Sequence, residues 1–150
     1  MSSNSAGNHL GVIVDTNFLL IPAQFKLDVF SEISRIVNTA HSVYILDRTR
    51  EELEHIIESQ KGKNRLAAKL ALQLVLIHLK TKDLKILPSP QEHIRPKTAE
   101  KAVDDLIVEI AAADPGKWIV ATQDLELKKR LRKHGVKLIV LRQKSHLELN

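Results

Sequence analysis

The sequence predicts an α/β protein in which helices cover both faces of a central five-stranded parallel sheet, a three-layer α/β/α arrangement. Short apolar runs alternate with longer segments of helical periodicity, and each run is apolar at nearly every position, as expected when neither face of the sheet meets water. The chain has 150 residues, 43% of them hydrophobic, which suits one compact domain and leaves no room for a second of ordinary size. We therefore expect one domain over residues 9–150, preceded by a flexible tail at residues 1–8.

The expected elements follow from these patterns in chain order. The five strands span residues 11–14, 43–46, 84–87, 118–121 and 136–141. The helices span residues 24–38, 50–59, 63–82, 99–113 and 125–134. The second and third helices form a pair joined near Gly62, the three prolines within residues 88–97 indicate a loop, and Gly135 is a helix stop.

Composition narrows the functional classes. The formal charge of +5 and a pI near 9.5 favour a polyanionic partner, whereas an aromatic content of 3% argues against a base-stacking platform. The absence of cysteine excludes disulfides, thiolate metal sites and cysteine nucleophiles, and it fits a reducing cytoplasm. The longest apolar stretch, residues 66–79, is too short to cross a bilayer, and the N-terminus does not resemble a signal peptide. A soluble, cytoplasmic protein without a membrane partner is expected.

Two aspartates follow predicted strands. Asp15 ends the first apolar run and precedes Thr16 and Asn17, and Asp124 follows the fourth run after Thr122. In open α/β sheets, ligands bind beyond the carboxyl ends of the strands, where the strand order reverses, so both positions favour a functional site. The alternative is local, because Asp15 is also suited to capping a turn and Asp124 to capping a helix N-terminus.

Further acidic residues lie on two predicted helices. Asp104 shares a helix side with apolar residues, which predicts a carboxylate at a buried edge, whereas Asp105 falls on the solvated side and is at best a supporting residue. Glu52 is open to two interpretations. The run from Thr49 to Glu52 matches a capping box, so Glu52 either closes a helix N-terminus or joins the site.

A cluster of these carboxylates would be repulsive unless a cation neutralises it or some members bind protons. An all-oxygen ligand set suits Mg²⁺ or Mn²⁺. Zinc is not supported, because the histidines lack the spacing of a zinc site.

Four motifs, in order and across almost the whole chain, resemble the PIN domain, a family of metal-dependent ribonucleases. They are Val-Asp-Thr-Asn-Phe-Leu-Leu at 14–20, Glu-Glu-Leu at 51–53, Asp-Asp-Leu-Ile at 104–107 and Ala-Thr-Gln-Asp at 121–124 with Leu127. Residues 17–25 and 135–142 are similar to the branch that contains archaeal stand-alone PIN proteins and the endonuclease that processes small-subunit ribosomal RNA. Gln123 departs from the asparagine frequent in that branch.

The resemblance implies an endoribonuclease that acts on RNA with Mg²⁺ or Mn²⁺ as cofactor, and it makes ribosomal RNA processing the candidate role. It implies that Asp15, Glu52, Asp104 and Asp124 form the catalytic and metal-binding quartet, supported by Asn17 and Thr122. For RNA binding, the sequence offers a basic run on the last helix, for which a solvated helix face is an equal alternative. The run comprises Lys128, Lys129, Arg130, Arg132 and Lys133.

Other functions are weighed against the endonuclease. A VapC-like toxin with an antitoxin partner stays within the same chemistry, and a non-catalytic RNA-binding scaffold in ribosome assembly has no reason to keep a costly charge cluster. Phosphorelay receivers and aspartate phosphatases require acidic residues where Thr16 and Asn17 stand. The leucine-rich third helix is interpreted either as core or as a homodimer or antitoxin surface through Leu66, Leu70, Leu74 and Ile77.

Overall fold

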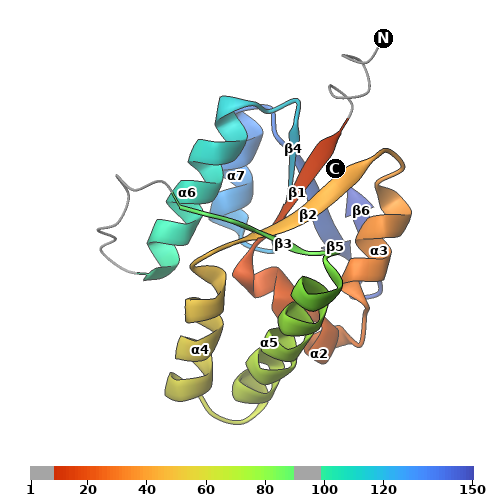
Figure 1. The fold of residues 1–150 in the computed structure, drawn as a ribbon. Helices are drawn as coiled ribbons and strands as arrows, with labels where there is room; N and C mark the ends of the chain where they lie inside the picture. The colour runs from red at the N-terminus through yellow and green to blue at the C-terminus, as the bar shows by residue number, and fades with distance from the viewer. Residues whose placement is uncertain (1–8, 90–98) are drawn as a thin grey trace.

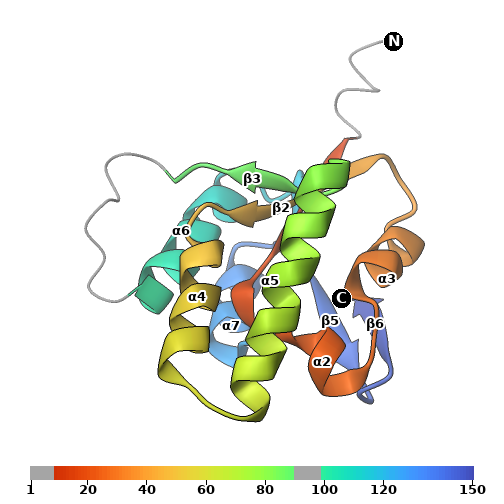
Figure 2. The same cartoon turned by 60° about the horizontal axis from the view of Figure 1, so that its bottom comes forward.

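The computed structural model, which describes residues 9–89 and 99–150, is a six-stranded sheet with helices on both faces (Figures 1 and 2). The predicted tail at residues 1–8 and most of the predicted proline loop lie outside the described residues. The strands are β1 (Leu10–Val14), β2 (His41–Leu46), β3 (Lys85–Leu87), β4 (Trp118–Ala121), β5 (Lys137–Arg142) and β6 (His146–Leu149). The helices are η1 (Thr16–Leu20), α2 (Ile21–Phe25), α3 (Val29–Ile36), α4 (Thr49–Ser59), α5 (Lys63–Thr81), α6 (Ala99–Ala113) and α7 (Leu125–Lys133).

The sheet has the order β3-β2-β1-β4-β5-β6 and is parallel except for β6, which pairs antiparallel with β5. The chain builds outward from β1 in one direction through β2 and β3, and in the other through β4 and β5. The strand order therefore reverses between β1 and β4, and the carboxyl ends of these two strands mark the crevice where α/β sheets bind ligands. The predicted three-layer α/β/α class is confirmed.

Successive residues of the central strands serve two separate cores, because side chains of a strand alternate between the faces of the sheet. Val12 and Val14 pack with the helices η1 to α5, whereas Ile13 packs with α6 and α7. All three side chains are buried. A strand buried on both faces must be apolar throughout, which is the pattern that predicted it.

Gly11 of β1 makes room for Trp118 on the neighbouring strand β4. A Cβ atom at Gly11 would lie 2.3 Å from Cζ3 of Trp118 and 2.6 Å from its Cε3. The indole is 8% exposed and packs edge-on against Tyr44, with ring centroids 5.5 Å apart, so moving it aside would disturb that contact. Glycine is needed here for close approach and not for an unusual backbone angle.

We expect Gly11→Ala to lower the free energy of unfolding by about 1 to 3 kcal/mol, the usual cost of overpacking a well-packed core. Urea denaturation measures the change. Gly116→Ala is the matched control, because nothing lies within 4 Å of a Cβ at Gly116. An equal midpoint for the wild type and Gly11→Ala would show that the indole can move aside.

The first predicted helix, residues 24–38, is wrong as a single helix. The chain forms α2 and α3 instead, separated by Lys26, whose φ of 54° is left-handed. Asp28 then caps α3: its Oδ1 accepts from the Ser31 N–H (3.2 Å) and its Oδ2 from the Ser31 hydroxyl (2.7 Å). A local cap satisfies the free N–H groups of a new helix and so stabilises the break.

A sixth strand, β6, was not predicted. It is joined to β5 by a turn in which Gln143 and Lys144 both have positive φ, 51° and 57°, as in a type I′ hairpin turn. Such turns normally contain Asn or Gly, so the sequence carries no hairpin signal here. The strand is also hard to see because Leu147 is its one buried residue.

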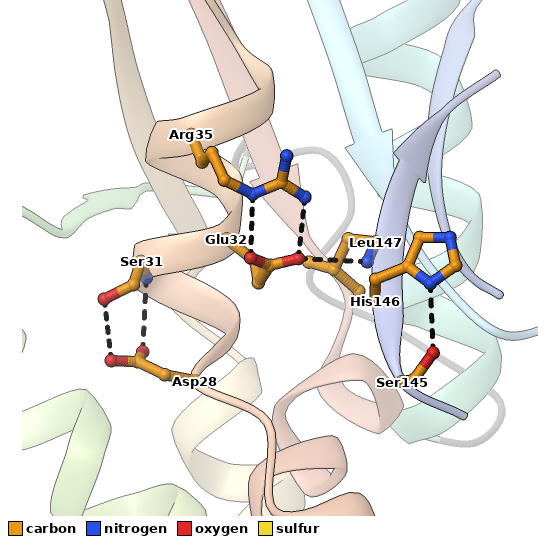
Figure 3. A network of polar contacts seen from close by, with 7 residues as sticks. All are labelled: Asp28, Ser31, Glu32, Arg35, Ser145, His146 and Leu147. Carbon is orange, nitrogen blue, oxygen red and sulfur yellow. Dashed lines mark hydrogen bonds and ion pairs between the residues drawn. The ribbon is translucent and has the colours of Figure 1, made fainter. Parts of the chain in front are cut away.

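Polar contacts anchor β6 to α3 (Figure 3). Glu32 of α3 accepts hydrogen bonds from the Arg35 guanidinium (2.9 and 3.0 Å) and from the backbone N–H of Leu147 (3.3 Å). The Arg35 contact is the main cause that holds the pKa of Glu32 below its usual value. Figure 3 also shows His146 beside Ser145, at 3.0 Å.

Helix α5 faces the core with small residues. Ala67, Ala68, Ala71 and Val75 are its buried positions. Leu66 and Ile77 are 65% and 55% exposed, so the interpretation of this leucine-rich face as core is wrong for both of them. Leu70 and Leu74 are half-buried. No helix of the described residues has the length and apolar character needed to span a bilayer.

Candidate active site

Asp15 lies directly after β1, the strand at the centre of the sheet. Its side chain is 4% exposed and is fixed by two hydrogen bonds. Oδ1 accepts from the backbone N–H of Thr16 (2.9 Å), and Oδ2 accepts from the hydroxyl of Thr122 (2.7 Å). A carboxylate held by two donors keeps one orientation, and charge-assisted bonds of this kind are stronger than neutral ones.

Thr122 connects the ends of β1 and β4. Its side chain is fully buried, and while its hydroxyl donates to Asp15 it also accepts from the backbone N–H of Asp124 (3.0 Å). Asp124 in turn caps α7, its Oδ1 accepting from the N–H groups of Glu126 (2.9 Å) and Leu127 (3.1 Å). The alternative interpretation, in which Asp124 caps a helix, is confirmed, and both cap hydrogen bonds use Oδ1. The predicted role of Asp124 in a functional site stays a prediction.

Glu52 does not close a capping box. Helix α4 begins at Thr49 itself, with Arg48 in the cap position and without a side-chain cap, so Thr49 is already helical. Its hydroxyl is buried without a hydrogen-bond partner among the described residues. Glu52 is 9% exposed and its Oε1 accepts a short hydrogen bond from the hydroxyl of Thr16. The capping interpretation of Glu52 is therefore wrong.

The two neighbouring aspartates of α6 point to different surroundings. Asp104 is half-buried, next to the buried Val103 and Ile107. Asp105 is exposed and forms an ion pair with Arg130 of α7 (3.0 Å). The structure thus places Asp105 away from the other carboxylates, where it connects two helices.

The four carboxylates line one cavity of about 360 Å³ at the carboxyl ends of the strands. The segments that enclose it are η1, α4, α6 and the start of α7. Its lining consists of Asp15, Thr16, Asn17, Leu20, Glu52, His55, Ile56, Ser59, Gln60, Asp104 and Asp124. No Lys or Arg of the described chain lines it. A larger cavity, about 540 Å³, includes Leu10 and Trp118 in its lining but no carboxylate.

A cation fits the chemistry of this lining, since several carboxylates gathered around one cavity repel one another unless positive charge offsets theirs. Within residues 9–89 and 99–150, no three acidic or histidine side chains are placed to hold one ion directly. Mg²⁺ usually keeps several water ligands and binds one or two carboxylates, so a partly water-mediated site suits these residues. Asn17 supports this end of the cavity: its Oδ1 accepts from the Gln123 N–H and its carbonyl from the Gln123 side chain, both at 3.4 Å.

The predicted basic run on α7 is divided by the fold. Lys128 is half-buried and lies one turn from Asp124, whereas Lys129 and Lys133 are exposed. Burial, followed by the nearby positive charges of Arg132 and Arg142, lowers the pKa of Lys128, and Asp124 opposes the shift. Arg130 forms the ion pair with Asp105. Lys128 therefore lies near Asp124 on one side and near Arg132 and Arg142 on the other.

Sequence reasoning missed six residues at the site. Thr16 orients Asp15 through its backbone and Glu52 through its hydroxyl, a pairing across 36 positions that no local pattern signals. The other five are Leu20, His55, Ile56, Ser59 and Gln60 of the cavity lining. A signal did exist for His55, Ile56 and Ser59, because residues three, four and seven positions after Glu52 share its face of the helix.

Comparison with known proteins finds a matching family, a similar ribonuclease and similar structures. The family described as "PIN like domain" matches residues 12–144. Ribonuclease VapC4 of Methanocaldococcus jannaschii is 35% identical over 140 residues, which cover 92% of this chain and 95% of the relative. The PIN domain endonuclease Utp24 superposes with a TM-score of 0.66 at 26% identity, covering 93% of this chain and 90% of that one. A domain of a functionally unknown protein from M. jannaschii has a TM-score of 0.58 at 17% identity, covering 89% and 91%, and shows the fold alone.

Proposed function

Because the chain belongs to the PIN-like domain family and is a homologue of a ribonuclease, we propose that it is a metal-dependent endoribonuclease that hydrolyses RNA phosphodiester bonds. One observation carries the proposal. Asp15, Glu52, Asp104 and Asp124, which come from four segments far apart in sequence, line one cavity at the switch point of the sheet. Burying or half-burying several carboxylates together lowers the stability of the fold, and a catalytic cation explains why they are gathered in one place.

The four carboxylates have two parts in the proposed reaction: three bind the metal ion and one orients the water. Asp15, Asp104 and Asp124 would hold Mg²⁺ or Mn²⁺, directly or through water. Bound there, such an ion supplies an activated water and neutralises charge on the scissile phosphate. Glu52, held in place by Thr16, orients the attacking water by accepting a hydrogen bond from it. The buried hydrogen bonds of Asp15 and Thr122 keep this end of the cavity fixed in advance of substrate binding.

RNA reaches the cavity along α7. Lys128 and Arg132 bind backbone phosphates on that side, which offsets the repulsion between the acidic cavity and the RNA chain. Arg130 contributes less, because Asp105 already neutralises it. Lys129 and Lys133 are exposed and add to the positive field of the helix.

Metal removal tests the proposal. We expect the purified protein to cut single-stranded RNA with Mn²⁺ or Mg²⁺, to stop in excess EDTA, and to recover when Mn²⁺ is added back. Gel analysis of end-labelled RNA measures the products, and internal fragments distinguish an endonuclease from an enzyme that trims ends. Cleavage that continues unchanged in EDTA would contradict metal dependence.

We propose two candidate cellular roles. Ribosomal RNA processing in the cytoplasm is the first candidate. A VapC-like toxin controlled by an antitoxin is the second, and the exposed Leu66 and Ile77 of α5 favour it, as they offer an apolar surface to a protein partner or a second copy. Growth arrest on expression of the wild type alone, relieved by loss of Asp15, would favour the toxin. A non-catalytic scaffold would instead bind RNA in the assay above and leave it intact.

A further inference from the structure

The cavity extends well beyond its carboxylates. Glu52, Ile56 and Ser59 follow one another along a single face of α4, and at 1.5 Å per residue Ser59 lies about 10 Å along the helix from Glu52. Leu20 of η1 also lines the cavity. The volume of about 360 Å³ is many times the roughly 30 Å³ that one water molecule occupies, so an ion and a few waters leave much of it unused.

The far half of the cavity is chemically different from the catalytic half. Leu20 and Ile56 are half-buried and provide an apolar wall, while His55, Ser59 and Gln60 provide exposed polar groups. No Lys or Arg belongs to the described lining of the cavity, so this half offers a phosphate no permanently charged side chain. It suits a flat, neutral group with polar edges.

Hydrogen bonds within the protein fix which polar groups at this end remain to donate or accept. Ser59 donates its hydroxyl hydrogen to the carbonyl of His55 (2.7 Å), so its oxygen remains an acceptor. Gln60 accepts through Oε1 from the Asn64 side chain (2.7 Å), which leaves the Gln60 Nε2 group to donate. An acceptor beside a donor complements the Watson–Crick edge of an unpaired nucleobase, which presents donors and acceptors side by side.

The wall is also held rigid. The Arg65 guanidinium at the start of α5 donates through Nε to the carbonyls of Ile57 (2.9 Å) and Gln60 (3.1 Å), which fixes the end of α4 against α5. The views agree on this pairing, since α4 and α5 lie side by side in Figures 1 and 2. A binding surface ordered in advance loses less conformational entropy when it binds.

We infer that the half of the cavity formed by Leu20, Ile56, Ser59 and Gln60 is a nucleobase subsite, which holds one unpaired base next to the scissile phosphate. The inference rests on the proposed function and adds to it the place where one base of the substrate binds. The phosphate meets the carboxylate half, the base turns toward α4, and the flanking backbone passes α7. A base held in a duplex cannot enter, because its Watson–Crick edge is occupied.

The test compares short single-stranded RNA oligonucleotides that carry one abasic nucleotide, moved along the chain position by position. Binding to the wild type is measured in EDTA, where the proposed cleavage does not occur. We expect the abasic nucleotide to weaken binding about 10-fold at one position and much less elsewhere, since burying one base contributes on the order of 1 to 3 kcal/mol. Gln60→Ala should reduce that position-specific loss about 3-fold or more, in line with one hydrogen bond.

Gln73→Ala is the matched control, because it removes the same amide from an exposed position of α5 outside the cavity. It should keep the wild-type binding pattern. An abasic effect that is equal at every position, or unchanged by Gln60→Ala, would overturn the subsite. Cleavage with Mn²⁺ is scored separately. Cutting without base dependence refutes the subsite alone, and base-dependent binding without cutting refutes the nuclease alone.

Discussion

Asp15→Asn is expected to reduce metal-dependent RNA cleavage by about 100-fold or more and to leave the fold intact. Losses of 10- to 100-fold are typical when a residue that merely supports a metal ligand is removed, and a direct ligand should cost at least as much. In free energy, 100-fold corresponds to about 2.7 kcal/mol of transition-state stabilisation. The variant loses one negative charge from the cavity lining, where a cation is proposed to bind.

The fold should tolerate the change because both hydrogen bonds have amide equivalents. The Asn oxygen can accept from the Thr16 N–H, and the Asn amide can donate to the Thr122 hydroxyl oxygen, which has two lone pairs. Removing one of several clustered carboxylates also relieves repulsion when no cation is bound. We therefore expect a urea midpoint in EDTA equal to or above that of the wild type.

The measurements are kcat/KM for a single-stranded RNA with Mn²⁺ and urea unfolding in EDTA. Asp105→Asn is the control, since it makes the same chemical change one residue from Asp104 at an exposed ion pair, and such pairs contribute little. It should retain activity within about twofold of the wild type. A fully active Asp15→Asn variant would remove Asp15 from the catalytic site.

Thr122→Val is expected to affect stability and activity together. Valine has nearly the shape of threonine, but the buried carboxylate of Asp15 loses a donor and the N–H of Asp124 loses its acceptor. An unsatisfied buried polar group costs about 1 to 3 kcal/mol, so the free energy of unfolding should fall by that amount. Activity should fall about 10- to 100-fold, because two of the carboxylate residues lose their fixed orientation.

Thr122→Ser separates positioning from packing. Serine keeps the hydroxyl and loses a buried methyl group, at about 0.8 kcal/mol, so it should be less stable than the wild type but nearly as active. Titration with Mn²⁺ adds a second readout, since weaker apparent metal affinity in Thr122→Val and not in Thr122→Ser would identify Thr122 as a positioning residue. Equal activity of the valine and wild-type proteins would show that its hydroxyl has only a structural effect.

Much of the fold could be predicted because the central strands are buried on both faces. That burial requires an unbroken apolar run, which is visible in the sequence without any knowledge of neighbours. The parts that were missed have weaker local signals. The break at Lys26 depends on a side-chain cap from Asp28, and the hairpin at Gln143 and Lys144 uses residues that rarely adopt positive φ.

The leucines of α5 illustrate a different limit. A helix that contacts its neighbours closely does so through small side chains, and here alanines face the core. Hydrophobicity alone ranks Leu66 and Ile77 above those alanines, although both are exposed. Which side of an almost uniformly apolar helix is buried depends on the shape of the surface it meets, and the sequence does not contain that shape.

By itself, the sequence determined the class of fold and the positions of Asp15 and Asp124. An acidic residue within a few positions after a buried parallel strand lies at the carboxyl end of the sheet, because the strand itself ends there. The tertiary structure decided what the helical acids do. It turned Glu52 toward Thr16 and not toward its own helix end, brought Asp104 to the cavity and placed Asp105 outside it. Those outcomes depend on contacts between residues far apart in the chain, which helix periodicity cannot encode.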